Sequence, residues 1–176
     1  MIKDLIAADA FNSYCVDCLE SPSTMFNVTF GVFICSHCAK THWHTFDMGK
    51  SYVKACFTEN WDKHQLKMAC MYGNKPFFEF MKCYKLERTK IEVKYRTVAA
   101  KYYRDRINAE VTDQPFQRDI PTRTEGGMSK RALQAKMAGI QISNTILPKG
   151  SQPHISAPTQ VKSQTSSANT STISQK

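Results

Sequence analysis

Two pairs of cysteines, each pair separated by two residues, constrain the fold of this chain more than any other feature. Cys15 and Cys18 form the first pair, Cys35 and Cys38 form the second, and sixteen residues lie between the pairs. Two intervening residues let one tight turn direct both sulfurs at the same point, and four such sulfurs make the closed tetrahedral site of structural zinc. Because this spacing is a strong zinc signal, the sequence predicts one Zn²⁺ per chain, held by these four cysteines.

Other uses of paired cysteines fit the pattern less well. The chain has seven cysteines, and an odd number disfavours the fully paired disulfide framework of a secreted protein. A single C-x2-C motif can be redox-active, but two matched pairs are better explained by a metal, and four thiolates leave no coordination position for water. We interpret Cys56, Cys70 and Cys83 as small buried hydrophobes, and His42 and His44 as neighbours of the second pair that are not ligands.

Charge and composition divide the chain into two parts. All 15 acidic residues lie within the first 125 positions, whereas the rest of the chain carries six basic residues and no acid. From Gly150 onward Ser, Thr, Gln and Asn dominate, and such a segment cannot bury enough apolar surface to order itself. We therefore expect a compact domain at 1–112 and a basic, low-complexity, extended tail at 113–176.

The tail carries one predicted helix, near 129–138, with Ser129 as its N-cap and Gly139 after its end. Its apolar residues are too sparse for a core of their own, yet they cluster ahead of the purely polar end. This distribution predicts an anchoring arm that extends over partner surfaces, although a flexible linker without a partner has a similar composition. The expected apolar contacts of the arm are Leu133, Met137, Ile140, Ile142, Ile146 and Leu147.

Hydrophobic spacing predicts a strand and several helices in the first part. The segment 27–34 is rich in β-branched and aromatic residues, as strands are, and Gly31 within it indicates a bulge or a close approach. Short helices are expected over 3–10, 61–72 and 76–84, the last with Pro76 as its first residue. The longest helix is expected over 90–107, with an apolar stripe that packs against the core. The stripe consists of Ile91, Tyr95, Val98 and Tyr102.

An excess of basic residues indicates partners that carry negative charge. Lys and Arg number 24 against 15 Asp and Glu, and nine of the basic residues fall between Lys82 and Arg106 among only three acids. On a helix with an apolar stripe, such charges are first of all a solvated face. The more specific interpretation is a partner with negative charge, either an anionic membrane surface or an acidic protein. Nucleic acid is the least favoured partner.

The sequence also indicates in which cellular compartment the protein is expected. Asp4 and Asp9 fall where the apolar core of a secretory signal should lie, and no apolar run approaches the roughly 20 residues that span a bilayer. We therefore expect an intracellular protein, cytoplasmic by default. An assembly associated with an organelle, mitochondria included, stays open.

The cysteine motif and its surroundings resemble the Arf GTPase-activating (ArfGAP) zinc-finger domain. The resemblance covers about residues 3–108 and implies a small α/β fold, in which a three-stranded sheet around the zinc is flanked by helices. The C-terminal tail would extend from this C4 zinc finger. The motifs that carry the resemblance are Asn12-x-x-Cys15-x-Asp17-Cys18, Gly31-Val32-Phe33-Ile34-Cys35-x-x-Cys38, Trp61 and Gly73-Asn74.

The resemblance implies GTPase activation, but one position departs from the family. ArfGAP domains carry an arginine five positions after the last cysteine and bring it to the GTP of an Arf-type GTPase, where it stabilises charge in phosphoryl transfer. Here that position is Trp43, whose indole offers one neutral N–H donor. We therefore predict a catalytically inactive module, without catalytic or cofactor-binding residues. It would serve as a protein-interaction or structural accessory subunit of a larger assembly.

Two alternatives keep the GTPase as a partner. The first is an active GTPase-activating protein for an Arf-family GTPase, for which Lys40, His42 or His44 would have to replace the arginine. The two histidines are mostly neutral at pH 7 and would be weak substitutes. The second is a module that binds the GTPase without catalysis, because loss of the arginine does not forbid binding. A second position that is basic in the family is kept only as a lysine, Lys54.

Overall fold

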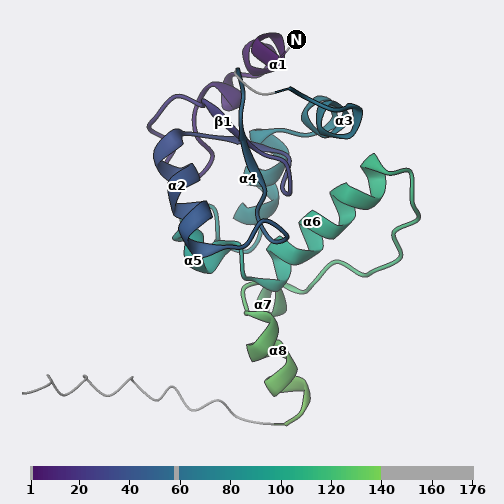
Figure 1. Cartoon of the computed structure of the whole chain (residues 1–176). Helices are drawn as coiled ribbons and strands as arrows, with labels where there is room; N and C mark the ends of the chain where they lie inside the picture. The colour runs from purple at the N-terminus through teal and green to yellow at the C-terminus, as the bar shows by residue number, and fades with distance from the viewer. Residues whose placement is uncertain (1, 58–59, 140–176) are drawn as a thin grey trace, which may run out of the picture. The chain divides into compact units, whose positions relative to one another are not determined.

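The computed structural model describes residues 2–57 and 60–139 (Figure 1). Four of the predicted arm contacts, from Ile140 to Leu147, lie outside these residues. No helix in the described ranges is long and apolar enough to cross a membrane. The elements, in chain order, are α1 (Ile2–Ala8), η1 (Ala10–Ser13), β1 (Met25–Asn27), β2 (Val32–Ile34), α2 (Ser36–Thr45), β3 (Val53–Ala55), α3 (Lys63–Met71), α4 (Asn74–Lys82), α5 (Ile91–Lys94), α6 (Val98–Val111), α7 (Arg123–Gly126) and α8 (Lys130–Met137).

A small antiparallel sheet confirms the fold that the resemblance implies. The strand order is β2-β1-β3, and Phe26 at the centre of β1 pairs with Phe33 on β2 and with Lys54 on β3. The prediction of one continuous strand over 27–34 is wrong. The chain reverses after β1, and Gly31 adopts a φ of +63° just before β2, a conformation that favours glycine. A run of β-formers does not distinguish one strand from a tight hairpin.

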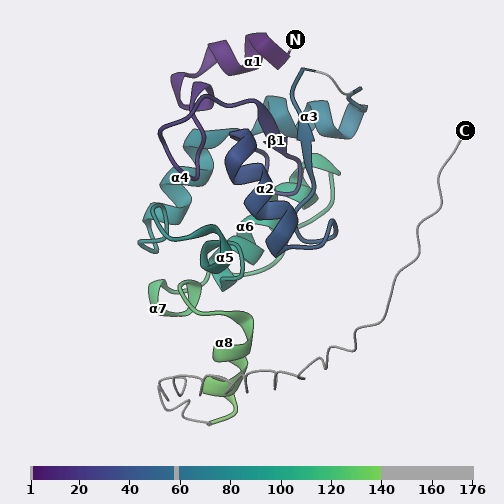
Figure 2. The ribbon, with the colours of Figure 1, turned by 60° about the vertical axis from the view of Figure 1, so that its left-hand side comes forward.

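Helices cover the sheet and enclose an aromatic core. Helix α2 lies beside α5 and against β1, whereas α6 packs against α3 and α4 (Figure 1, Figure 2). Phe26, Phe30, Phe33, Phe77 and Tyr103 are each less than 2% exposed. Burial of each such side chain contributes about 1.5–3 kcal/mol, so this cluster holds the helices on the sheet.

The predicted long helix over 90–107 is two helices. Helix α5 ends at Lys94, and α6 begins at Val98 after Thr97, whose side chain accepts a hydrogen bond from the Ala100 N–H. An N-cap threonine has an extended backbone and satisfies a free N–H of the first turn, so it starts a new helix where the hydrophobic period alone predicts continuation. Helix α4 also starts two residues before Pro76. The predicted N-cap of α8, Ser129, is confirmed by its bond from the Ala132 N–H.

The segment after α6 returns to the rest of the unit. The Tyr84 hydroxyl donates to the Pro121 carbonyl at 2.9 Å, and Gly126 packs so closely that a Cβ there would lie 2.1 Å from the Tyr84 ring. All described residues up to 139 belong to one compact unit. The segment 113–139 also contacts α6, where Arg118 pairs with Asp105 and Phe116 packs against Tyr102. The domain boundary after residue 112 stays a prediction.

Asn74 joins the N-terminal segment to the sheet. Its Oδ1 accepts from the Phe33 N–H at 2.7 Å, and its Nδ2 donates to the carbonyls of Phe11 and Tyr14 at 2.9 and 2.7 Å. Its own backbone N–H donates to Asn12 Oδ1 at 2.9 Å. A single buried amide therefore satisfies backbone groups of two segments more than 40 residues away.

Replacing this amide should be costly. We expect Asn74→Ala to lower the free energy of unfolding by about 2–4 kcal/mol, because it leaves an N–H and two carbonyls without partners. Urea unfolding at saturating metal measures the loss. Asn108→Ala on the exposed face of α6 is the matched control and should change stability by about 0.5 kcal/mol or less. Equal losses from the two variants would contradict the role assigned to Asn74.

Candidate metal centre

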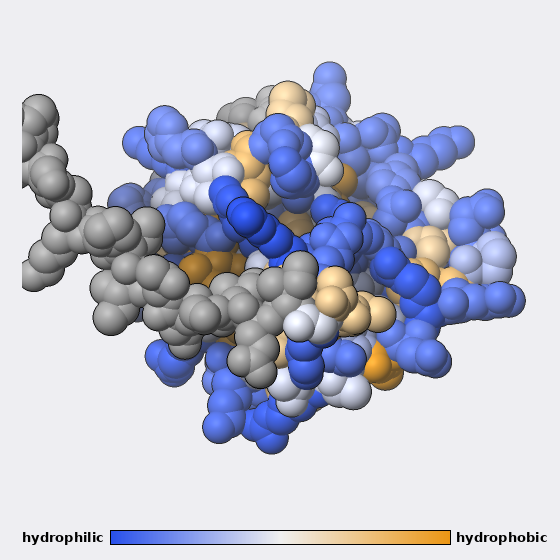
Figure 3. Space-filling view, turned by 90° about the horizontal axis from the view of Figure 1, so that it is seen from below, coloured by the Kyte–Doolittle hydropathy of each residue, from blue (hydrophilic) through white to orange (hydrophobic). Residues whose placement is uncertain are grey.

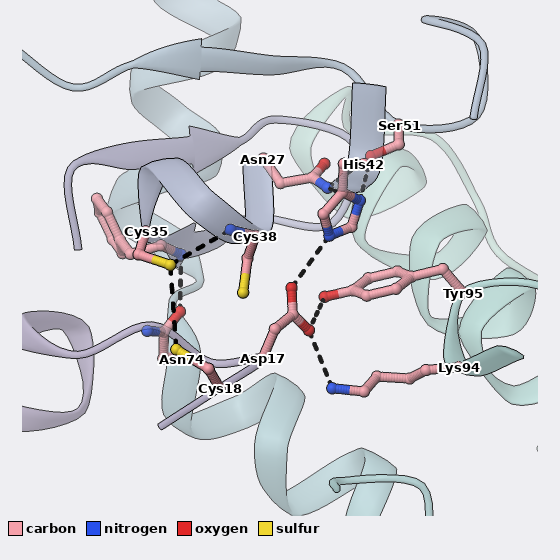
Figure 4. Close-up of polar contacts among 11 residues, drawn as sticks. Asp17, Cys18, Asn27, Cys35, Cys38, His42, Ser51, Asn74, Lys94 and Tyr95 are labelled. Atoms are coloured by element: carbon pink, nitrogen blue, oxygen red, sulfur yellow. Dashed lines mark hydrogen bonds and ion pairs between the residues drawn. The ribbon is translucent and has the colours of Figure 1, made fainter. Parts of the chain in front are cut away.

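Four cysteines from two turns converge beside the sheet, and Figure 4 labels three of them, Cys18, Cys35 and Cys38. Cys15 and Cys18 follow η1, whereas Cys35 is the N-cap of α2 and Cys38 lies in its first turn. All four sulfurs lie within 4.8 Å of one another, and those of Cys18 and Cys35 are 4.0 Å apart. All are free thiols, not disulfides. The sequence spacing thus brings together the four residues that it singled out.

The geometry and chemistry of this cluster fit a tetrahedral ion. A zinc–sulfur distance of about 2.3 Å places the sulfurs of a tetrahedron about 3.8 Å apart, which is close to the Cys18–Cys35 separation of 4.0 Å. The Cys38 N–H donates to Cys35 Sγ at 3.4 Å, so the backbone already helps to neutralise a thiolate. The four cysteines could therefore hold a metal ion.

The thiol pKa values show what the cluster requires. A hydrogen bond from Cys38 lowers the pKa of Cys15 to about 5. The same bond, together with burial and the charge of Cys15, raises the pKa of Cys38 far above its ordinary value, and burial raises the pKa of Cys35. The protein alone thus favours the Cys15 thiolate and opposes ionisation of Cys35 and Cys38. Four thiolates in one place need a cation to offset their repulsion.

Asp17, between the first two cysteines, is the centre of a buried polar network (Figure 4). Its Oδ1 accepts from Lys94 Nζ and from the Tyr95 hydroxyl, both at 2.9 Å, and its Oδ2 lies 3.0 Å from His42 Nε2. The side chains of Asp17 and Lys94 are each 1% exposed. Burial alone would raise the pKa of Asp17, but the Lys94 ammonium and His42 hold it at about 2. The network ties the first cysteine turn to α2 and α5.

Ser51 and Asn27 extend this network. His42 Nδ1 lies 2.8 Å from Ser51 Oγ, which accepts from Asn27 Nδ2 at 2.8 Å. Asp17, His42 and Ser51 therefore form a chain of the kind seen in nucleophilic catalysis. His42 is 0% exposed and Ser51 2%, so no substrate can reach the serine. The arrangement holds α2 and the loop before β3 in place.

Breaking the central ion pair should destabilise the protein strongly. We expect Asp17→Asn to cost about 3–5 kcal/mol, because it leaves the Lys94 ammonium buried without a counter-charge. The double variant Asp17→Asn/Lys94→Met should recover part of this loss. Urea unfolding at saturating metal measures both. Asp47→Asn removes an exposed partner of Lys50 and should cost about 1 kcal/mol or less. A loss for Asp17→Asn as small as this would show that the pair is not structurally important.

The predicted cationic substitutes for the missing arginine have different surroundings. Trp43 lies on the surface of α2 and is 49% exposed, and Lys40 and His44 are exposed nearby in the same helix. His42 is buried in the Asp17 network. Lys54 is buried as well, where it donates to Gln65 Oε1 at 2.7 Å.

Arg96 is a residue near α2 that sequence reasoning missed. Its guanidinium donates to the Thr45 carbonyl at 3.2 Å, at the end of α2, and lies 5.4 Å from the Phe46 ring centroid. The only signal for it was the basic stretch between Lys82 and Arg106.

The three remaining cysteines differ in burial. Cys56 is 3% exposed, as predicted, but Cys70 and Cys83 are exposed, so their interpretation as buried hydrophobes is wrong. Helix α3 buries Met68 and Ala69, which turns the next residue, Cys70, outward. Cys83 is the C-cap of α4 and its thiol donates to the Glu79 carbonyl at 3.4 Å.

Comparisons with known proteins agree with this geometry. Residues 1–112 match the family described as "Putative GTPase activating protein for Arf". An uncharacterised protein of Caenorhabditis elegans is 31% identical over 98 residues, which are 55% of this chain and 18% of that protein. The ADP-ribosylation factor GTPase-activating protein 3 of Bos taurus is 28% identical over 99 residues, which are 56% of this chain and 19% of that protein. The chain thus spans about a fifth of the length of these relatives.

A solved structure shows the same fold. The "putative GTPase activating protein for ADP ribosylation factor" from Cryptosporidium parvum superposes with a TM-score of 0.56 at 20% sequence identity. The match covers 62% of this chain and 90% of that one.

Proposed function

The chain belongs to the ArfGap family, and from this premise we propose that it is a catalytically inactive member, which serves as a protein-interaction or structural accessory subunit of a larger assembly. The observation that carries the proposal is the exposed indole of Trp43 on α2, at the position where the family resemblance expects an arginine. An indole has neither the charge nor the forked donors with which a guanidinium stabilises a phosphoryl group in transfer.

The cations that the sequence suggested as substitutes give no replacement with the same chemistry. Both ring nitrogens of His42 face protein groups, Asp17 on one side and Ser51 on the other. Lys54 is buried and bonded. Lys40 is exposed, but an ammonium is a point charge without the planar geometry of arginine. These contacts support the proposal that the catalytic group is missing and that none of these residues replaces it.

The metal in this proposal is Zn²⁺, held by Cys15, Cys18, Cys35 and Cys38. A zinc ion with four thiolate ligands has no open coordination position, so it supplies folding stability and no reaction chemistry. The cysteines fix the start of α2 and thereby the exposed face that carries Trp43. The metal would then position the residues that contact a partner, although these residues do not themselves contact the metal.

A second candidate is an active GTPase-activating protein for an Arf-family GTPase. The position of Arg96 favours it, because the guanidinium lies against Thr45 and Phe46 at the end of α2. In that case Arg96 would supply the charge that residue 43 lacks.

Single-turnover GTP hydrolysis by Arf-family GTPases separates the two candidates. An arginine supplied by an activator accelerates hydrolysis by about 10³–10⁵, so an inactive module should leave the intrinsic rate unchanged. Acceleration of about a hundredfold or more, abolished by Arg96→Ala, would overturn the proposal in favour of the second candidate. Binding to the GTP-loaded GTPase, measured alongside, shows whether the partner is retained. Affinity purification from the source cell with mass spectrometry tests the accessory role.

A further inference from the structure

A cavity of about 540 Å³ opens where the loop after α2 meets the starts of α6 and α8. Its charged lining consists of Asp47, Lys50, Arg96, Lys101, Arg104 and Lys130. Phe46, Tyr95 and Thr97 contribute to the wall. Figure 3 shows the face from which α8 projects, where strongly hydrophilic side chains surround smaller apolar areas.

Positive charge remains in excess after every ion pair of this region is counted. Asp47 pairs with Lys50 at 2.5 Å. Asp105, beside the cavity, pairs with Lys101, with Arg104 and with Arg118 outside the lining.

Two further cations of the lining are not neutralised in this way. Within the described residues, neither Arg96 nor Lys130 forms an ion pair. The lining itself holds five cations and one carboxylate, and therefore an excess of four positive charges around one cavity.

Several contacts hold this charge in place. Arg96 is fixed by the Thr45 carbonyl at 3.2 Å and by the Phe46 ring. The Tyr95 hydroxyl is anchored on Asp17 at 2.9 Å, which makes the cavity wall part of the buried network. A pre-formed wall lowers the ordering cost of binding a ligand.

The two helix starts add to the positive potential. Thr97 and Ser129, the N-caps of α6 and α8, pair as an isolated β-bridge. The Val98 N–H donates to the Met128 carbonyl at 2.8 Å, which holds Lys130 beside the start of α6. Helix N-termini carry a partial positive charge that reinforces nearby cations.

We propose that this cavity binds the headgroup of a multiply phosphorylated inositol, either free or as part of a phospholipid. Guanidinium and ammonium groups together are the protein's usual phosphate ligands, and four excess charges match more than one phosphate. The volume of 540 Å³ falls in the range of small-molecule sites, about 300–1,000 Å³. Such a concave site with aromatic side chains suits a compact ring better than an extended acidic peptide. The proposal does not depend on Trp43, which is not part of the cavity lining, although the lining shares Arg96 with the second candidate function.

Isothermal titration of the full chain with inositol trisphosphate tests the site. We expect saturable one-to-one binding that weakens as salt is added, because screening reduces such contacts. Arg96→Glu/Lys130→Glu should weaken binding by about tenfold or more. Lys75→Glu/Lys82→Glu makes the same change in net charge on exposed positions of α4 and should leave the affinity within about twofold. Lys130→Glu alone places an acid at a helix start, where negative charge is stabilising, so this variant should stay folded. Weaker binding by it therefore cannot be attributed to unfolding.

Vesicles distinguish the two sources of the headgroup. Phosphatidylcholine vesicles with phosphatidylinositol bisphosphate are compared with vesicles of equal charge that contain phosphatidylserine. Selective binding to the former, lost in the cavity variant, assigns the site to a lipid, whereas binding of the soluble trisphosphate alone assigns it to a free ligand. Both results support the proposal. No saturable binding in either arm, equal loss in the two double variants, or equal binding to both vesicle types without saturable binding of the trisphosphate would overturn it.

Discussion

Removal of the metal is expected to unfold the described unit and not merely to loosen the cysteine turns. Binding of structural zinc contributes about 10–16 kcal/mol, whereas the whole stability of a small domain is about 5–15 kcal/mol. The cysteine turns also carry Asp17, which holds α2 and α5 through His42 and Lys94. Loss of the ion would leave the thiolates to repel one another, and the network built on the first turn would lose its anchor.

Chelation followed by circular dichroism measures this loss, and metal analysis of the untreated protein should find one zinc per chain. Cys15→Ser should behave like the chelated protein, because a serine hydroxyl does not replace a thiolate ligand. Cys70→Ser is the matched control, since Cys70 is exposed and lies outside the cluster. A Cys15→Ser variant that melts like the Cys70→Ser control would contradict the zinc assignment. So would native disulfides joining Cys15 to Cys18 or Cys35 to Cys38.

The cysteine cluster could be predicted from the sequence because its geometry is mainly local. Two residues between cysteines determine one turn, and the spacing then indicates that two such turns share an ion. The three-stranded sheet came from the family resemblance, because the run from Asn27 to Ile34 does not reveal where the chain reverses. The local pattern thus predicted which cysteines come together, and the resemblance predicted the sheet and helices around them.

The buried network could not be predicted in the same way. Asp17 and Lys94 are separated by 77 positions, and nothing in the residues around Lys94 distinguishes it from the solvated lysines nearby. The break between α5 and α6 depends on whether Thr97 caps a helix or continues one, which the period of apolar residues does not decide. These features follow from tertiary packing, which overrides local preference.

The described residues include only part of the predicted anchoring arm. Of its six expected apolar contacts, Leu133 and Met137 lie on α8, and Met137 is 81% exposed. The other four lie outside the described residues. The exposed Met137 side chain is consistent with a partner, so the arm stays a proposal that complements the accessory role. A variant lacking residues 140–176 that was fully retained in its native complex would contradict that part of it.

A substitution at position 43 should have the largest effect on GTPase-activating activity. We expect Trp43→Arg to convert an inactive module into one that accelerates GTP hydrolysis by an Arf-family GTPase about a hundredfold or more. An arginine in this role is worth about 10³–10⁵ in rate. The gain should fall below the upper end, because Thr45 and Phe46 replace the Leu-Gly that the family resemblance expects beyond the arginine. The helix should accept the change, since Trp43 is 49% exposed and its neighbour His42 keeps α2 in place through Asp17 and Ser51.

Single-turnover hydrolysis with saturating module measures this gain, and two variants separate charge from geometry. Trp43→Lys supplies a cation without forked donors and should give at most about a tenth of the arginine effect, whereas Trp43→Ala should give none. If Trp43→Arg binds the GTP-loaded GTPase and still leaves the intrinsic rate unchanged, the surface around α2 has lost more than its arginine. If the wild-type protein is as active as Trp43→Arg, the missing group is supplied elsewhere. The inactive assignment then fails, and Arg96 is the residue to replace next.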